Sequence, residues 1–73
     1  MWGTMDIYEA INEEKKIKLV ITKDEGVTYY LLEVYQSGSD QVTDNALYYR
    51  LEDAFSAAHN KYGINKEKWM QEK

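Results

Sequence analysis

The chain has 73 residues, a formal net charge of −4 and no cysteine. This length corresponds to a single domain, 1–73, which buries only about 60–65% of the surface exposed by its unfolded chain. The absence of cysteine excludes disulfides and thiolate metal ligands, and a single histidine argues against a histidine-based metal site. We therefore expect no metal and no cofactor, with stability coming from a well-packed core or from self-association.

Hydropathy indicates a folded protein outside the membrane. Hydrophobic residues make up 44% of the chain and proline is absent, a composition that favours a core over disorder. The sequence contains no apolar run of roughly 18–20 residues, the length needed to span a bilayer. Its first six residues lack the basic start and apolar middle of a secretory signal. We expect a cytoplasmic protein, with Met1 or Met5 as the start.

The first predicted element is a short N-terminal helix over residues 6–14. Asp6 is a suitable N-cap, and Glu9, three residues later, completes a capping box. Apolar residues then recur at helical spacing, at Ile7, Ala10 and Ile11. A strand is the competing interpretation, because Ile7 and Tyr8 also suit a sheet.

A β-hairpin is predicted over residues 16–36. Ile17, Leu19 and Ile21 alternate with polar residues, which is typical of a strand over 16–23. A turn over 24–26 follows, where Gly26 tolerates positive φ. Residues 27–36 then return as a second strand rich in β-branched and aromatic types.

The remaining pattern predicts a third strand near 42–49 and a helix over 50–62. Helical register also extends back to Asp44, so an earlier helix start competes with the strand. We prefer the strand because a two-stranded sheet is marginal by itself. The apolar stripe of the helix consists of Leu51, Ala54, Phe55, Ala58 and Tyr62. Gly63 is placed to end this helix, and a last helical turn carrying Trp69 and Met70 is expected to follow.

These elements predict an α+β fold with the order α-β-β-β-α. A small three-stranded antiparallel sheet, made of the hairpin 16–36 and the strand near 42–49, packs against the C-terminal helix 50–62. The short helix 6–14 precedes the sheet.

No catalytic residues are predicted. Asp53, Ser56 and His59 are spaced three apart on one helix, so their side chains project outward and do not converge on a substrate. The acidic loop 40–45 lacks the alternating ligands and central glycine of an EF-hand. We therefore expect that the protein is not an enzyme.

Lysines form the one basic concentration, at Lys15, Lys16, Lys18 and Lys23. Lysines at these positions would prevent an exposed strand from pairing with a strand of another molecule. The alternative function is a nucleic-acid-binding accessory protein that uses Lys15, Lys16 and Lys18 with sheet tyrosines such as Tyr29. The net charge of −4 disfavours this alternative, because a negatively charged protein is repelled by phosphate backbones.

The second strand of the hairpin is apolar on both sides. Tyr30, Leu32 and Val34 form one face, and the candidate partner-binding residues on the other are Tyr29, Leu31, Glu33 and Tyr35. Three outcomes are open for this second face. The N-terminal helix covers it with Trp2 or Trp69, a second copy of the chain pairs with it, or a different protein docks on it.

The function predicted from these features is a small acidic, non-enzymatic protein-interaction module. Roles as an inhibitor, an immunity-type protein or an accessory protein fit the size and charge. The partner is another protein or a second copy of the chain. Tyrosine-rich strands followed by a helix that starts at Leu51 are common among small bacterial and phage-type proteins, including proteins encoded by mobile elements, and this combination carries no specific function.

Overall fold

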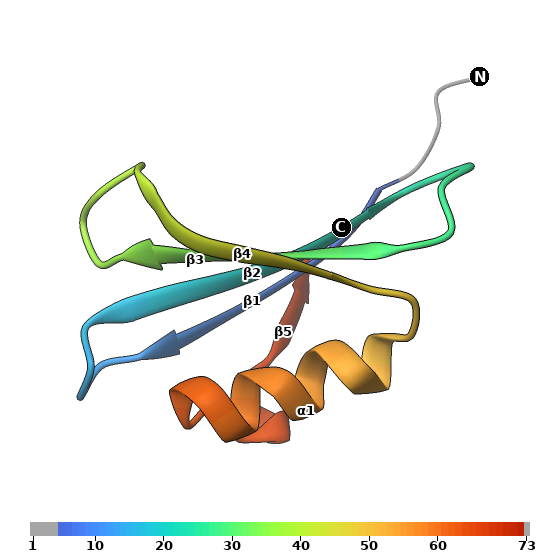
Figure 1. Cartoon of the computed structure of the whole chain (residues 1–73). Coiled ribbons are helices and arrows are strands. Elements are labelled where there is room, and N and C mark those ends of the chain that lie inside the picture. The colour runs from blue at the N-terminus through green and yellow to red at the C-terminus, as the bar shows by residue number, and fades with distance from the viewer. Residues whose placement is uncertain (1–4, 73) are drawn as a thin grey trace.

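The computed structural model describes residues 5–72, which form one five-stranded sheet and one long helix. In chain order the elements are β1 (Met5–Asn12), β2 (Ile17–Asp24), β3 (Tyr30–Gln36), β4 (Val42–Tyr48), α1 (Leu51–Tyr62), the 3-10 turn η1 (Lys66–Lys68) and β5 (Met70–Glu72). The strand order is β4-β3-β2-β1-β5 and every neighbouring pair is antiparallel. Figure 1 shows that α1 lies along one side of this sheet.

The prediction of an N-terminal helix over 6–14 is wrong, because this segment is strand β1. All eight residues of β1 pair with β2, with Ala10 opposite Leu19 and Tyr8 opposite Ile21. A helix would also satisfy its own backbone groups, but as a strand the segment joins the sheet and places Ala10 in the core with Tyr8 packed against it. Apolar residues of this segment lie on both faces of β1, Ile7 and Ile11 on one and Tyr8 and Ala10 on the other, so the local pattern does not distinguish strand from helix and pairing with β2 determines the structure.

The prediction of a three-stranded sheet is also wrong, since β1 and β5 raise the number of strands to five. Residues 70–72 form β5 and pair with Ile7–Glu9, where the sequence had indicated a last helical turn. That turn is limited to η1, which ends before Trp69. The hairpin of β2 and β3, strand β4 and helix α1 lie close to their predicted ranges, although β3 begins at Tyr30 and not at residue 27.

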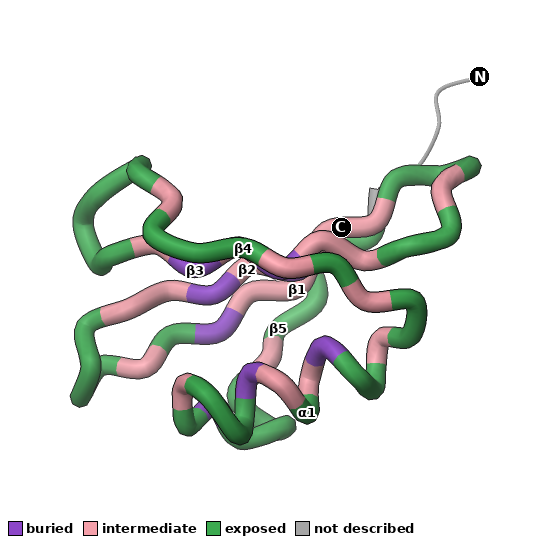
Figure 2. The backbone as a smooth tube through the Cα atoms, in the orientation of Figure 1, coloured by how far each residue is buried: buried purple, intermediate pink, exposed green. Residues whose placement is uncertain are grey.

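The hydrophobic core lies entirely between the sheet and the elements after β4. Its fully buried residues are Ala10, Leu19, Ile21, Leu32, Val34, Ala54, Ala58 and Ile64. Figure 2 shows the buried positions in purple on β1, β2 and β3 and on the turns of α1 nearest the sheet. The two alanines of α1 let the helix backbone approach the strands closely, so the larger side chains of β2 and β3 fill the layer between them.

Aromatic rings close the core on the β1 side. The Tyr8 and Phe55 rings meet edge to face with centroids 5.8 Å apart, and Trp69 packs on Phe55 at 5.2 Å. These contacts place the indole of Trp69 on the side of the sheet that α1 covers. They also hold the chain beside β1, where it continues directly into β5.

Hydrogen bonds fix the C-terminal end of α1 to both halves of the sheet. Gly63 adopts a left-handed conformation with φ of 69°, and the amide of Ile64 donates to the carbonyl of Ala58, as in a Schellman motif. The Asn12 side chain on β1 donates to the Tyr62 carbonyl at 2.8 Å. The Tyr62 hydroxyl donates to the Asp44 carboxylate on β4 at 2.5 Å.

The layered core predicts unequal costs for the same substitution on the two sides of the sheet. Leu19→Ala removes a side chain with no exposed surface and should lower the free energy of unfolding by about 2–5 kcal/mol. Leu47→Ala, at a side chain that is 59% exposed, should change it by about 0.5 kcal/mol or less. Urea denaturation followed by circular dichroism measures both. Equal losses would contradict the one-sided core.

The bond between Tyr62 and Asp44 predicts a pH-dependent contribution to stability. This hydrogen bond, together with burial, raises the pKa of Tyr62 to about 12. A raised tyrosine pKa means that the fold favours the neutral phenol, so the contribution is complete below pH about 10 and is lost as pH rises towards about 12. The stability difference between the wild type and Tyr62→Phe should therefore be constant from pH about 7 to 9 and shrink above pH about 10. A difference that grows over this range would contradict the assignment.

Candidate functional site

The side of the sheet opposite α1 forms a surface that we call the open face. Side chains alternate along each strand, so residues paired with one another across strands share a face. The open face consists of Ile7, Glu9 and Ile11 from β1, Lys18, Val20 and Thr22 from β2, Leu31, Glu33 and Tyr35 from β3, Val42, Asn45 and Leu47 from β4, and Met70 from β5. Within residues 5–72 no helix or strand lies over this side of the sheet (Figure 1).

Strand register arranges the open face into three rows that run across the strands. One outer row is Ile7, Thr22, Leu31 and Leu47, and the other is Ile11, Lys18 and Tyr35, with Val42 opposite Tyr35 after a register shift in β4. The middle row is Met70, Glu9, Val20, Glu33 and Asn45. The outer rows are mostly apolar, and the middle row contains both carboxylates.

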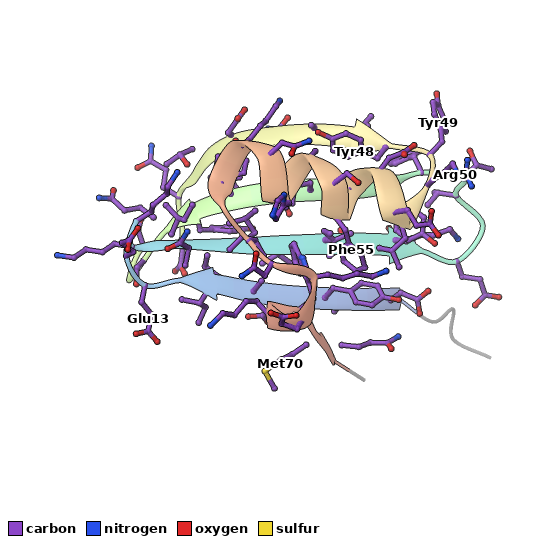
Figure 3. The ribbon with its side chains drawn as sticks, turned by 90° about the horizontal axis from the view of Figure 1, so that it is seen from below. Glu13, Tyr48, Tyr49, Arg50, Phe55 and Met70 are labelled. Atoms are coloured by element: carbon purple, nitrogen blue, oxygen red, sulfur yellow. The ribbon has the colours of Figure 1, made fainter. Side chains whose placement is uncertain are left out.

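Several apolar side chains of the open face are strongly exposed at its margins. Ile11 is 53% exposed, Leu47 is 59% exposed and Met70 is 73% exposed. Figure 3, which views the sheet from the α1 side, shows Met70 at the β5 edge. Side chains nearer the centre, such as Val20 and Leu31, are half-buried by their neighbours. The open face therefore exposes apolar area along its whole width, while the core residue Leu19 on the other side has none exposed.

Tyr35 has charged neighbours on both sides. The Lys18 ammonium lies over its ring, 5.4 Å from the centroid, in the geometry of a cation–π contact. Partial burial, the negative charge of Glu33 and a hydrogen bond to that carboxylate raise the pKa of the Tyr35 hydroxyl above its ordinary value. Lys18, Tyr35 and Glu33 thus form a connected polar group within an otherwise apolar surface.

Three of the four residues predicted to bind a partner lie together on the open face. Leu31, Glu33 and Tyr35 alternate along β3 and point to the same side. Tyr29 precedes β3 in the connecting loop and is 39% exposed. Sequence reasoning missed the contribution of β1, because a helix over 6–14 was expected there. The suitability of Ile7 and Tyr8 for a sheet was the signal that could have identified it.

The elements expected to cover this face lie elsewhere. The N-terminal segment belongs to the sheet as β1, where Ile7 and Ile11 enlarge the apolar surface and do not shield it. Trp69 packs with Phe55 on the α1 side. Trp2, the other candidate, lies outside the described residues.

The lysines of the nucleic-acid alternative lie at one end of β2, where Lys18 contacts the sheet tyrosine Tyr35. Lys15 and Lys16 lie in the turn between β1 and β2, and Lys18 lies on the open face. Lys23 approaches the Tyr30 ring, 6.0 Å from its centroid, on the side that α1 covers. Tyr29 lies near the far end of the hairpin from Lys16, because β2 and β3 run antiparallel. The structure does not bring the proposed lysines and Tyr29 together.

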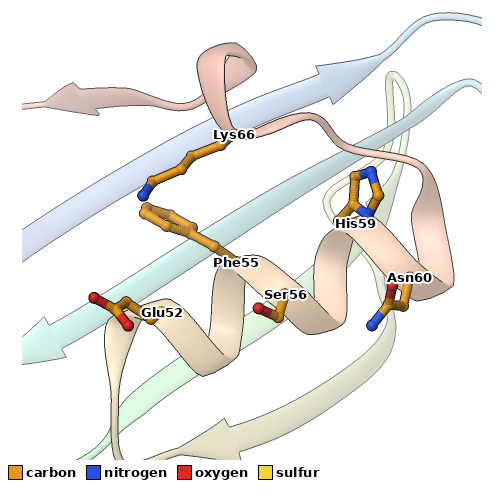
Figure 4. Close-up of a pocket in the computed structure, with 6 residues that line it drawn as sticks. All are labelled: Glu52, Phe55, Ser56, His59, Asn60 and Lys66. Carbon is orange, nitrogen blue, oxygen red and sulfur yellow. The ribbon is translucent and has the colours of Figure 1, made fainter.

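A groove runs along the outer side of α1, between the helix and η1. It has a volume of about 430 Å³ and is lined by Glu52, Phe55, Ser56, His59, Asn60 and Lys66. Figure 4 shows the Lys66 side chain extended towards the Phe55 ring, with Ser56 and His59 on the same helix. Within residues 5–72 no hydrogen bond joins Asp53, Ser56 and His59, and Asp53 does not line the groove. Their arrangement is that of a solvated helix surface.

Two further features concern metals and membranes. No group of three or more His, Asp or Glu side chains within the described part of the chain is arranged to hold a metal ion. Among the described helices, none combines the length and the apolar character needed to cross a membrane.

Comparisons with protein families, with curated proteins and with solved structures found no match to this chain. The candidate site is therefore defined by its own geometry.

The surroundings of Tyr35 predict a specific titration. Its hydroxyl should ionise above pH about 10, the ordinary range for tyrosine, because the Glu33 carboxylate favours the neutral phenol. Glu33→Gln should move this pKa down towards the ordinary value. The shift is measured from the ring carbon chemical shift of Tyr35 as a function of pH, with the more exposed Tyr49 as the internal control. An unchanged Tyr35 pKa in Glu33→Gln would show that the two side chains do not interact in solution.

Proposed function

We propose that this protein is a non-enzymatic protein-interaction module whose working surface is the open face. The observation that supports the proposal is the apolar character of a sheet surface that the described part of the chain leaves uncovered. All five strands contribute an apolar side chain to it. An inhibitor, an immunity-type protein or an accessory protein of a larger assembly would act in this way.

The dimensions of the open face suit a protein partner. Five strands about 4.8 Å apart span about 19 Å between the outer strands, and the five residues from Ile7 to Ile11 span about 13 Å before their side chains are counted. This gives a surface of several hundred Å², against about 800 Å² per partner in a typical protein interface. Single exposed apolar residues are ordinary on soluble proteins, whereas here apolar side chains from all five strands share one face, with charged and polar residues between them.

The shape and charge of the open face favour protein over other ligand classes. Small molecules are usually bound in concave pockets, whereas a sheet surface offers a broad area without deep enclosure. Nucleic acids require basic surface, and the middle row places Glu9 and Glu33 where a phosphate backbone would have to pass. Tyr35 together with the aliphatic side chains matches the composition of protein interfaces.

Site-specific crosslinking tests the proposal. A photoreactive phenylalanine analogue replaces Tyr35 on the open face or Tyr49, which is 78% exposed and lies outside the open face, between β4 and α1 (Figure 3). In cells that make the chain naturally, the Tyr35 position should give an adduct with another polypeptide in at least about tenfold higher yield than the Tyr49 position. The polypeptide identified in the adduct is then captured with two lysine variants. Tyr35→Lys should no longer capture it, whereas Tyr49→Lys should capture it as the wild type does.

Three results would contradict the proposed function. Equal adduct yields at the two positions would show that the open face is not preferred. Adducts that disappear on nuclease treatment would identify a nucleic acid in place of a protein. Unchanged partner capture by Tyr35→Lys, with circular dichroism unchanged, would show that a different surface is used.

A further inference from the structure

The middle row of the open face carries two carboxylates at a defined separation. Glu9 and Glu33 lie on either side of Val20, on strands separated by β2. Two strand spacings place their backbones about 10 Å apart. Both side chains are half-buried, and among residues 5–72 neither forms an ion pair, although Glu33 accepts a hydrogen bond from the Tyr35 hydroxyl. The one basic residue of the open face, Lys18, lies in an outer row over the Tyr35 ring.

These charges restrict what can cover the surface. A carboxylate that loses water on binding costs free energy unless a cation or hydrogen-bond donor replaces that water. A second copy of the chain is a poor occupant, because it would bring the Glu9 and Glu33 carboxylates of two middle rows together, and the middle row contains no lysine or arginine. The occupant must therefore supply two positive charges at the spacing of Glu9 and Glu33, with apolar side chains around them.

Resting on the proposed function, we propose that the open face binds a basic amphipathic helix of a partner protein that crosses the strands along the middle row. In this helix two arginine or lysine residues stand seven positions apart and pair with Glu9 and Glu33. Seven residues correspond to about 10.5 Å along a helix axis, which is close to the distance of about 10 Å between the backbones of Glu9 and Glu33. The apolar residues at the third and fourth positions between them fall on the same side of the helix and contact Val20.

The outer rows complete this site. They lie about 6.6 Å to either side of the middle row, two residues along each strand, so they contact the flanks of a helix about 10 Å wide. Leu31 in one outer row and Tyr35 in the other are thus positioned to pack against the apolar side chains of that helix. A partner strand fits less well, because residues on one face of a strand repeat at about 6.6 or 13 Å.

A peptide series provides the test, with the full chain as receptor. The reference probe is an alanine-rich helical peptide of about 18 residues with arginine at positions i and i+7 and leucine at i+3 and i+4. A second peptide has the same composition but moves one arginine to i+5, on another side of the helix. A third peptide replaces both arginines by glutamine, and a fourth replaces both leucines by serine. Fluorescence anisotropy gives each Kd.

A pair of chain variants with equal charge change separates site-specific from general electrostatic binding. Glu9→Gln with Glu33→Gln removes the two carboxylates of the middle row. Glu13→Gln with Glu14→Gln removes two exposed carboxylates in the turn between β1 and β2, outside the open face. Both variants should retain the circular dichroism of the wild type.

The proposal predicts that the reference peptide binds and that each of the other three binds at least about tenfold more weakly. Glu9→Gln with Glu33→Gln should weaken the reference peptide by about tenfold and remove its advantage over the rearranged peptide, while Glu13→Gln with Glu14→Gln should change its Kd less than about twofold.

Four results would overturn this assignment. They are equal binding of the reference and rearranged peptides, equal sensitivity to the two charge variants, a stable dimer in light scattering that Tyr35→Lys dissociates, and no peptide binding at all. The last result combined with a protein adduct at Tyr35 would reject the basic helix and leave the proposed function standing.

Discussion

One short helix can cover only one face of the sheet, and the arrangement of the whole domain follows from this limit. Helix α1 has 12 residues and runs along the strands (Figure 3), so it covers a width of about 10 Å of a sheet that is about 19 Å wide. Every fully buried residue in the described chain lies between the sheet and the segment that begins with α1. The strands therefore have one side that supplies stability and another that is available for contact.

The parts of this fold that local pattern determines could be predicted, and the parts that pairing determines could not. The alternation of apolar and polar residues identified β2. The apolar stripe from Leu51 to Tyr62, followed by Gly63, identified α1. In the N-terminal segment, the apolar residues suit both a helix and a strand that is apolar on both faces. The capping signal at Asp6 favoured the helix, which the structure contradicts. Strand β5 has only three residues, and its formation depends on pairing with Ile7–Glu9, far away in sequence.

The candidate site follows the same division. Leu31, Glu33 and Tyr35 were identified because they share one side of a single strand, which needs no knowledge of the neighbouring strands. The row that contains Glu9, Val20 and Glu33 requires the register of three strands, and register is set by the core on the opposite side. The spacing between the Glu9 and Glu33 backbones is thus set by the fold, whereas the sequence alone shows only that both residues are present.

Methyl groups on the two sides of the sheet report most directly on whether the open face is free in the isolated chain. Relaxation by a soluble paramagnetic agent can be measured by NMR for Ile7, Ile11, Leu31 and Leu47, with Leu19 and Ile21 as buried references. If the sheet has one covered and one open side, the first group relaxes much faster than the second. Equal relaxation of the Leu31 and Leu19 methyl groups would mean that the open face is covered, and would contradict its assignment as a free binding surface.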